Sequence, residues 1–296
     1  MASLRMTWIV ATLLAGAGLP LGCGGSSARN PPANAASAAA ADDDPMSGLA
    51  EHHRYHHHGG VTLFVAMSLD TLGVAPDQQA AVDKIHSELN ALMAPARAAE
   101  QALTATLADE LAAETFDVEK VNAAVSQVAV AAAAVHAGSA DALDELHKLL
   151  TPAERAALVD KVAAHWAVWR EANAGATDAG NTTDGYLAMD LDLTADQMAK
   201  IHTGLGDDMK SSAPLAQQEI TAHLAAFSDA FRSETFEAHA INTESHANEH
   251  LAGWGAAHMA HFVEVASLVL TPEQRTKLVE RLREHASHDA GIQGAL

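Results

Sequence analysis

The sequence LTPEQR at residues 270–275 repeats, with two changes, the sequence LTPAER at residues 150–155, which lies 120 residues earlier. Two further pairs of blocks recur in the same order: ETFD at 114–117 with ETFE at 234–237, and LGVAPDQ at 72–78 with LDLTADQ at 191–197. Matched blocks in one order are typical of an internal repeat. The sequence therefore predicts two copies of one module.

Helix-start signals divide each copy in the same way. Thr271 is followed by Pro272 and Gln274, which is typical of an N-cap, a proline at the first helical position and a capping box. These helix-start signals predict an all-α fold with four helices per module. The expected helices are 77–93, 96–113, 117–149 and 152–169 in the first module and 195–210, 214–233, 237–269 and 272–287 in the second. The short apolar run at 61–65 allows a strand, but beside helical modules we expect an extended arm.

The first residues have the pattern of an export signal. Arg5 precedes an apolar run from Met6 to Leu21, and the single cysteine, Cys23, follows in LPLGC, which resembles a bacterial lipobox. We expect acylation of Cys23 and a lipid-anchored protein of the bacterial cell envelope that faces the periplasm, or a secreted one if the lipobox is not used.

Composition then sets the expected boundaries, because the Gly-, Ser-, Pro- and Ala-rich stretch after Cys23 has too little apolar surface to fold. The expected segments are a lipoprotein signal peptide at 1–22, a disordered tether with a His-rich segment at 23–60, module one at 61–170, a linker at 171–184, module two at 185–289 and a tail at 290–296.

The charge of the chain excludes several partners. Its 296 residues carry 17 basic and 38 acidic side chains, a formal charge of −21. Nucleic-acid binding requires clustered Lys and Arg, so we expect no nucleic acid and membrane contact through the lipid anchor only. A single cysteine excludes an internal disulfide framework and a Cys-rich zinc site.

The paired Leu-Thr-x-x-Gln motifs, with a Thr-Phe-Asp/Glu block before the third helix, resemble the hallmark of the Spy/CpxP family of periplasmic proteins. The first module departs from this hallmark at Ala75 and Glu154, and the resemblance covers about residues 61–289. We expect the motif residues to cap helices, and in the second module they are Leu193, Thr194, Gln197, Leu270, Thr271, Pro272 and Gln274.

The resemblance implies a function. Members form thin helical hairpins that dimerise into a cradle, which holds unfolded clients without ATP. We therefore expect an ATP-independent chaperone (holdase) that acts on unfolded envelope proteins in a stress response. Its two modules would pair as an intramolecular pseudo-dimer, since linkage raises their effective concentration; a homodimer is the other arrangement. The strongly acidic chain departs from the basic client-binding face of Spy.

Histidines support an alternative, a periplasmic heavy-metal-binding or metal-sensing protein like the ZraP and CnrX members. On an ideal helix over 237–269, four histidines fall within a stripe about 60° wide, and an i,i+4 pair among them can reach one ion. Zinc, nickel or copper suits imidazole, although no cofactor is required. The candidate ligands are His239, His246, His250 and His261, and in the tether His52, His53, His56, His57 and His58.

An enzyme is not expected. The spacing in HANEH at residues 246–250 differs from that of zinc proteases, in which the glutamate follows the first histidine. No serine or cysteine nucleophile stands out, and Cys23 is expected to be acylated. The histidine stripe is also consistent with a solvated helix face that binds no metal.

Overall fold

The computed structural model describes residues 60–113, 116–174, 191–208, 216–241 and 245–292. Within these ranges every regular element is a helix, which confirms the all-α fold. Apart from the third helix of each copy, the helices begin and end within five residues of their predicted limits. The elements are α2 (Gly60–Asp70), α3 (Pro76–Leu92), α4 (Ala94–Ala112), α5 (Val118–Gly138), α6 (Ala140–Leu149), α7 (Pro152–Ala174), α9 (Ala195–Asp208), α10 (Gln217–Arg232), the 3₁₀ helix η2 (Ala238–Ala240), α11 (Ala247–Ser267) and α12 (Pro272–Ile292).

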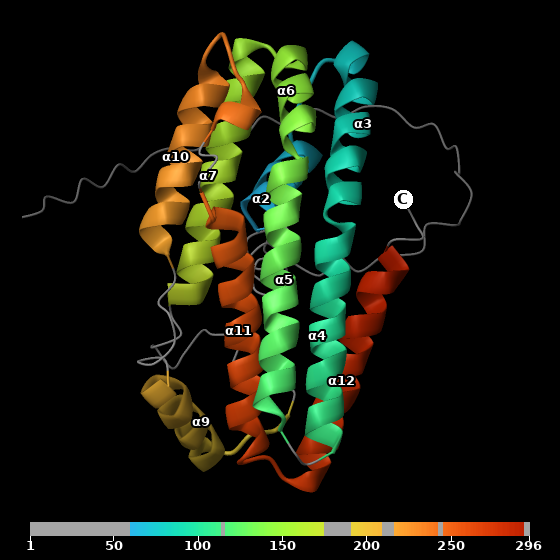
Figure 1. The fold of residues 1–296 in the computed structure, drawn as a ribbon, viewed down its shortest axis with the longest axis vertical. Helices are drawn as coiled ribbons and strands as arrows, with labels where there is room; N and C mark the ends of the chain where they lie inside the picture. Colours follow the sequence, from blue (N-terminus) through green and yellow to red (C-terminus); the bar gives the residue numbers. More distant parts are fainter. Residues whose placement is uncertain (1–59, 114–115, 175–190, 209–215, 242–244, 293–296) are drawn as a thin grey trace, which may run out of the picture. The chain divides into compact units, whose positions relative to one another are not determined.

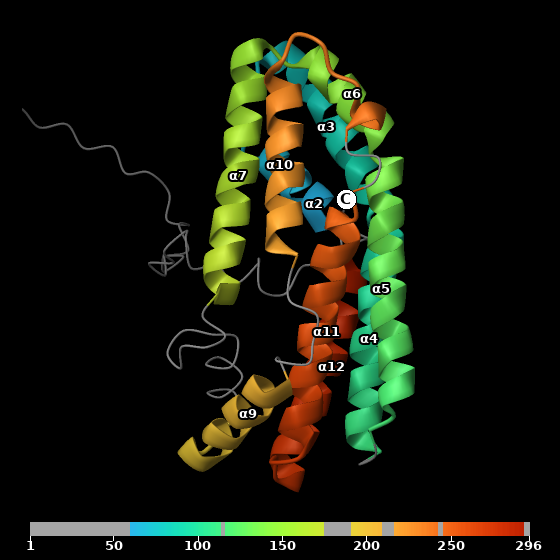
Figure 2. The ribbon, with the colours of Figure 1, turned by 60° about the vertical axis from the view of Figure 1, so that its left-hand side comes forward.

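Helices from the first half (60–174) pack on helices from the second half (191–292). The most extensive contacts join α4 with α12 and α5 with α11, and α4 also lies against α5 (Figure 1). α10 lies beside α7, as both views show (Figure 2). The long helices of one half therefore find their main partners in the other.

The apolar interior reflects this packing. One buried cluster joins α2, α3, α6 and α7 to α10 and the start of α11, and it contains the aromatic side chains Phe64, Trp169 and Phe231. A second cluster joins α4 and α5 to α9, α11 and α12, and Leu103 and Leu107 are fully buried in it. Each cluster draws side chains from both halves, so neither half buries its apolar surface alone.

The run at 61–65, expected to form an extended arm, is helical. It belongs to α2, most of which is buried among α3, α5, α7 and α11. A buried segment must satisfy its backbone hydrogen bonds, and a helix does so within itself. The buried Asn248 caps its start, because its Oδ1 accepts the Val61 N–H at 2.6 Å while its Nδ2 donates to Thr62 Oγ1 at 3.0 Å.

The long third helix expected at 117–149 is divided at Ser139, which ends α5 and precedes α6. The Ser139 N–H points at the carbonyls of both Val135 and His136, and its hydroxyl donates to the His136 carbonyl at 3.0 Å. Gly–Ser pairs are common sites of helix kinks, so the Gly138–Ser139 step accounts for the break.

The corresponding prediction at 237–269 is wrong for residues 237–241, and residues 242–244 lie outside the described range. Residues 238–240 form η2, the backbone of Ile241 is extended, and α11 begins at Ala247 after the N-cap His246. Ser245 Oγ accepts the Ala247 N–H at 3.2 Å, a local side-chain bond to the backbone that competes with a helix before Ala247. Once begun, α11 continues through Gly253, where a Cβ would lie 3.1 Å from the Ala129 Cβ; this glycine allows α5 and α11 to approach closely.

We predict that Gly60→Ala destabilises the fold while Gly73→Ala does not. Gly60 has φ +54°, and a Cβ there would lie 2.7 Å from Asn248 Cα. Left-handed backbone alone costs roughly 1–2 kcal/mol for a residue other than glycine, so the free energy of unfolding should fall by at least that amount. Gly73 has nothing within 4 Å of such a Cβ and is the matched control. Urea denaturation measures both, and equal losses would contradict the prediction.

Candidate functional site

The two Leu-Thr-x-x-Gln motifs of the second half meet through their glutamines. Gln197 Nε2 donates to Gln274 Oε1 at 2.7 Å and to the Val269 carbonyl at 2.9 Å. In return, Gln274 Nε2 donates to the Leu191 and Asp192 carbonyls at 3.1 and 3.2 Å. Each glutamine therefore binds the chain next to the other motif and joins the starts of α9 and α12.

The same glutamines close capping boxes on their own helices. Gln197 Oε1 accepts the Thr194 N–H at 2.9 Å, and Gln274 Oε1 accepts the Thr271 N–H at 3.0 Å. The threonine hydroxyls accept the glutamine N–H groups in return. The remaining motif residues lie around these caps: Leu193 half-buried, Leu270 buried and Pro272 exposed. The motif residues therefore hold helix ends together.

The first half repeats this arrangement with a glutamate. Gln78 Nε2 donates to the Leu149 carbonyl at 2.9 Å and to Glu154 Oε2 at 3.3 Å, and Leu149 lies 120 residues before Val269. The N–H and hydroxyl of Thr151 donate to Glu154 and lower the pKa of its carboxyl.

The arginines that follow the motifs also correspond. Arg155 donates to the His147 carbonyl at 3.4 Å, and Arg275 donates to the Ser267 carbonyl at 3.2 Å. Both acceptors lie eight residues before their arginine, at the end of the preceding helix. The two halves thus place the same kinds of side chain on the same backbone groups.

The predicted histidine stripe does not form as one helix face. His239 lies on η2 rather than on α11, and its Nε2 is 2.9 Å from Asp141 Oδ1, an acidic residue of the first half. The hydrogen bond that this exposed imidazole donates to the Asp141 carboxylate raises its pKa. The stripe depended on a continuous helix through 237–269, and the late start of α11 removes His239 from it.

The structure does bring His246 and His250 together, with their ring centroids 5.8 Å apart. Glu219 of α10 accepts the backbone N–H of His246 at 2.9 Å and lies 2.7 Å from Nδ1 of the His250 ring, whereas Nδ1 of the His246 ring lies 3.0 Å from Glu249. Burial raises the pKa of Glu219, but the hydrogen bonds from His246 and His250 outweigh it, and the pKa is lowered overall. This cluster connects the starts of α10 and α11.

The other predicted ligands lie apart. His261 is half-buried and its Nδ1 lies 3.5 Å from Glu264. The histidines at 52–58 and the lipidation candidate Cys23 fall outside the described residues. Within the ranges that the structure describes, no group of three or more His, Cys, Asp or Glu side chains is placed to hold a metal ion.

An uncharged helix face lies on α5. Between Lys120 and His136 the sequence has no charged residue, and among the described helices α5 alone has the length and composition of a membrane span. Its buried residues are Val121, Val128, Ala132 and Val135. On the opposite side of α5, exposed residues recur at intervals of three and four positions. We call this row of residues the α5 stripe, and it consists of Ala123, Gln127, Val130, Ala134 and Ala137. Val130 is 61% exposed, which is unusual for a valine.

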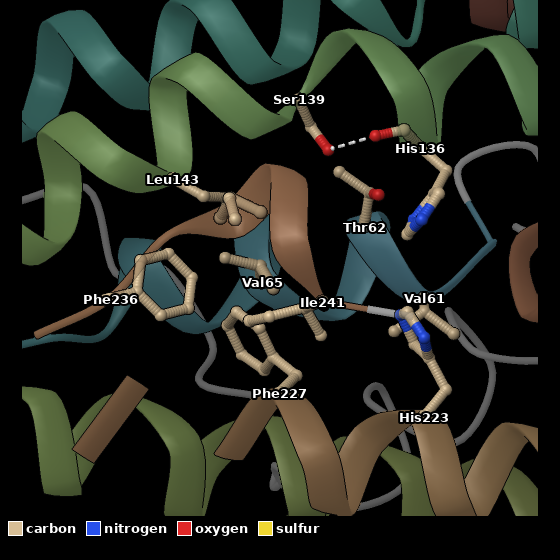
Figure 3. Close-up of a pocket in the computed structure, with 11 residues that line it drawn as sticks. Val61, Thr62, Val65, His136, Ser139, Leu143, His223, Phe227, Phe236 and Ile241 are labelled. Carbon is tan, nitrogen blue, oxygen red and sulfur yellow. Dashed lines mark hydrogen bonds between the residues drawn. The ribbon is translucent and has the colours of Figure 1, made fainter. Parts of the chain in front are cut away.

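A small cavity opens where α2, α5, α6 and α10 meet (Figure 3). Its volume is about 40 Å³, and apolar side chains such as Val65, Phe227 and Phe236 line most of it. Two imidazoles complete the lining, His136 from α5 and His223 from α10, and they face one another. Their ring centroids are 5.1 Å apart in an edge-on arrangement.

Burial determines the charge of this pair. His223 is 6% exposed, and its Nδ1 has no hydrogen-bond partner among the described residues. Burial first and His136 second lower the pKa of His223 to about 4, against an opposing effect of Glu219. Burial also lowers the pKa of His136. Both rings are therefore neutral at pH 7. The sequence alone did not reveal this pair, because its members lie 87 residues apart on helices whose contact no local pattern indicates.

Comparison of the chain with protein-family models, with curated proteins and with solved structures gave no match. The site is therefore interpreted from its own residues.

We predict that Gln197→Ala and Gln274→Ala each lower the free energy of unfolding by about 1–2 kcal/mol, because each removes a cap and a bridge between helix ends. Since the two side chains bind one another, the double variant should lose less than the sum of the single losses, by about 1 kcal/mol. Gln79→Ala, which removes an exposed bond to Asp83, is the control. Strict additivity in denaturant unfolding would contradict the bridge.

Proposed function

We propose that this protein is an ATP-independent holdase of the Spy/CpxP type, anchored in the bacterial cell envelope through Cys23, which shields exposed apolar segments of unfolded envelope proteins. The α5 stripe carries the proposal. It offers a row of uncharged side chains about 20 Å long, given the helical rise, on a chain whose formal charge is −21.

Physical chemistry links such a face to a holdase. Apolar segments of a client leave water when they bind an uncharged helix face, and exposed apolar surface of this kind is typical of interaction sites. The strong negative charge of the surrounding chain keeps the complex in solution through repulsion. No nucleotide site is needed, because the client leaves when its own folding buries the segment.

Duplication is the second part of the proposal. The matching bonds of Gln78 and Gln197, and of Arg155 and Arg275, support two equivalent modules. The packing of α4 on α12 and of α5 on α11 supports their pairing as an intramolecular pseudo-dimer.

An aggregation assay with an ordinary unfolding substrate tests the holdase. We expect the full chain to suppress aggregation equally with chelator and with added zinc; dependence on zinc would favour the metal-binding alternative. Val130→Asp/Ala137→Asp should raise the concentration needed for half-suppression about tenfold, or about 1.4 kcal/mol of binding free energy, because a bound apolar segment would desolvate the new carboxylates. Ala157→Asp/Ala164→Asp adds the same charge at exposed positions of α7 and is the matched control. Equal activity of both variants would remove the stripe from the proposal.

Light scattering tests the pseudo-dimer. We expect the full chain to have the mass of one chain, and separately expressed pieces covering 61–170 and 185–289 to associate. A stable two-chain mass together with pieces that never associate would contradict intramolecular pairing.

A further inference from the structure

The His136–His223 pair occupies a position that the fold fills elsewhere with apolar side chains. In the 120-residue repeat, His223 corresponds to Leu103 and His136 corresponds to Ala256. Leu103 is 0% exposed and Ala256 is 4% exposed, and both belong to the second buried cluster. The register is supported by burial, because every buried residue of α10 has a buried counterpart on α4: Ile220 with Glu100, His223 with Leu103, Leu224 with Thr104, Phe227 with Leu107 and Phe231 with Leu111.

The two corresponding pairs of positions therefore differ in chemistry, although His223 is buried like its counterpart Leu103. One is a leucine and an alanine within a packed core. The other is two imidazoles, an unpartnered Nδ1 on His223 and a cavity of about 40 Å³. An unsatisfied buried polar atom costs stability, and the fold has an apolar solution for the same place. The pair is therefore not explained by packing.

Few charged groups face the pair. On α10 the nearest is Glu219, one turn before His223, and the backbone N–H of His246 and the ring of His250 already bind its carboxylate. The cavity lining from α2, α6 and η2 has no titratable side chain. A third imidazole, that of the buried His147 of α6, stacks on Phe236, and its Nε2 lies 2.9 Å from the Ser233 carbonyl. Other titratable groups on neighbouring elements also have partners: Asp144 accepts the Ala238 N–H, Asp160 pairs with Arg232, His239 pairs with Asp141 and His165 stacks on Phe64. The first proton added to the pair is therefore stabilised by one nearby carboxylate, that of Glu219. A second proton is opposed by the positive charge of the first.

We propose that His136 and His223 form an acid-operated latch: protonation of the pair releases α10 from α2 and α5 and uncovers the aromatic surface of Phe227, Phe231 and Phe236. Both rings are neutral in the closed form, so their edge-on contact and the apolar cavity walls add to the packing on α7 and α11 that holds α10 in place. Charged rings repel one another and favour water over the cavity. The latch joins the two halves of the chain, and it does not depend on the holdase activity.

The direction and size of the effect follow from linkage. A histidine exposed by opening titrates at its ordinary value of 6.5, whereas closed His223 titrates at about 4. Above pH 6.5 both forms are neutral and the latch stays closed. As the pH falls from 6.5 to 4 the open form gains protons that the closed form lacks. At pH 5 this difference favours opening by about 30-fold.

Hydrogen exchange of the full chain at pH 7.5 and pH 5, corrected for intrinsic exchange, tests the latch. We expect protection of the α10 amides to fall by about 30-fold at pH 5. The α4 amides, which carry Leu103 in place of His223, should keep theirs and so provide a control within the same molecule. Equal loss in α4 and α10, or no loss in α10, would overturn the proposal.

Variants identify the responsible groups. His136→Ala/His223→Leu installs the side chains of the equivalent contact and should abolish the pH-dependent loss in α10. The single variant His223→Leu serves if the double variant does not fold. His86→Ala, on α3 outside the cavity lining, should behave like the wild type. A dye that binds exposed apolar surface should fluoresce at pH 5 with the wild type and His86→Ala but not with the double variant; fluorescence with all three would show that other groups open the chain.

Discussion

Burial of apolar surface between the two halves of the chain is the interaction on which the other features depend. Leu103, Leu107 and Leu111 of α4 become fully buried in a cluster completed by α11 and α12. Phe227 and Phe231 of α10 similarly enter a cluster built mostly by the first half. Because each half supplies part of two cores, separating the halves would expose both at once. This shared burial fixes where the helix ends, the α5 stripe and the histidine pair lie.

Features set by neighbouring residues were predictable from the sequence. The caps at Thr194 and Thr271 lie where the capping-box pattern places them, since a capping box involves four consecutive residues. The kink at Ser139 and the late start of α11 were missed, although Gly138–Ser139 and Ser245 carry local signals for both. The helical state of α2 had no such signal, because burial among four helices rather than propensity decides it.

The candidate site shows even more clearly that contacts between distant helices cannot be predicted from local sequence. The spacing of His246 and His250 indicated that the two rings would be neighbours, but nothing local pointed to Glu219 on another helix as the partner of the His250 ring. His136 and His223 were invisible for the same reason. One signal was available in the repeat itself: a histidine at the position of Leu103 places a polar group where the other copy has a core residue.

The proposed duplication accounts for how such a change can be tolerated. A fold with two equivalent inter-half contacts can keep one fully apolar, as at Leu103 and Ala256, while the other takes side chains that lower stability in return for sensitivity to solvent conditions. Val130 and His250 also occupy equivalent positions, and one belongs to an uncharged face while the other binds Glu219. At the helix ends, by contrast, Gln78 and Gln197 make corresponding bonds, as do Arg155 and Arg275, although Ala75 and Glu154 stand where the second half has Thr194 and Gln274. Under the proposed duplication, the halves therefore differ more on their exposed faces and buried contacts than at their helix ends, because the bonds that join helix ends leave less room for change.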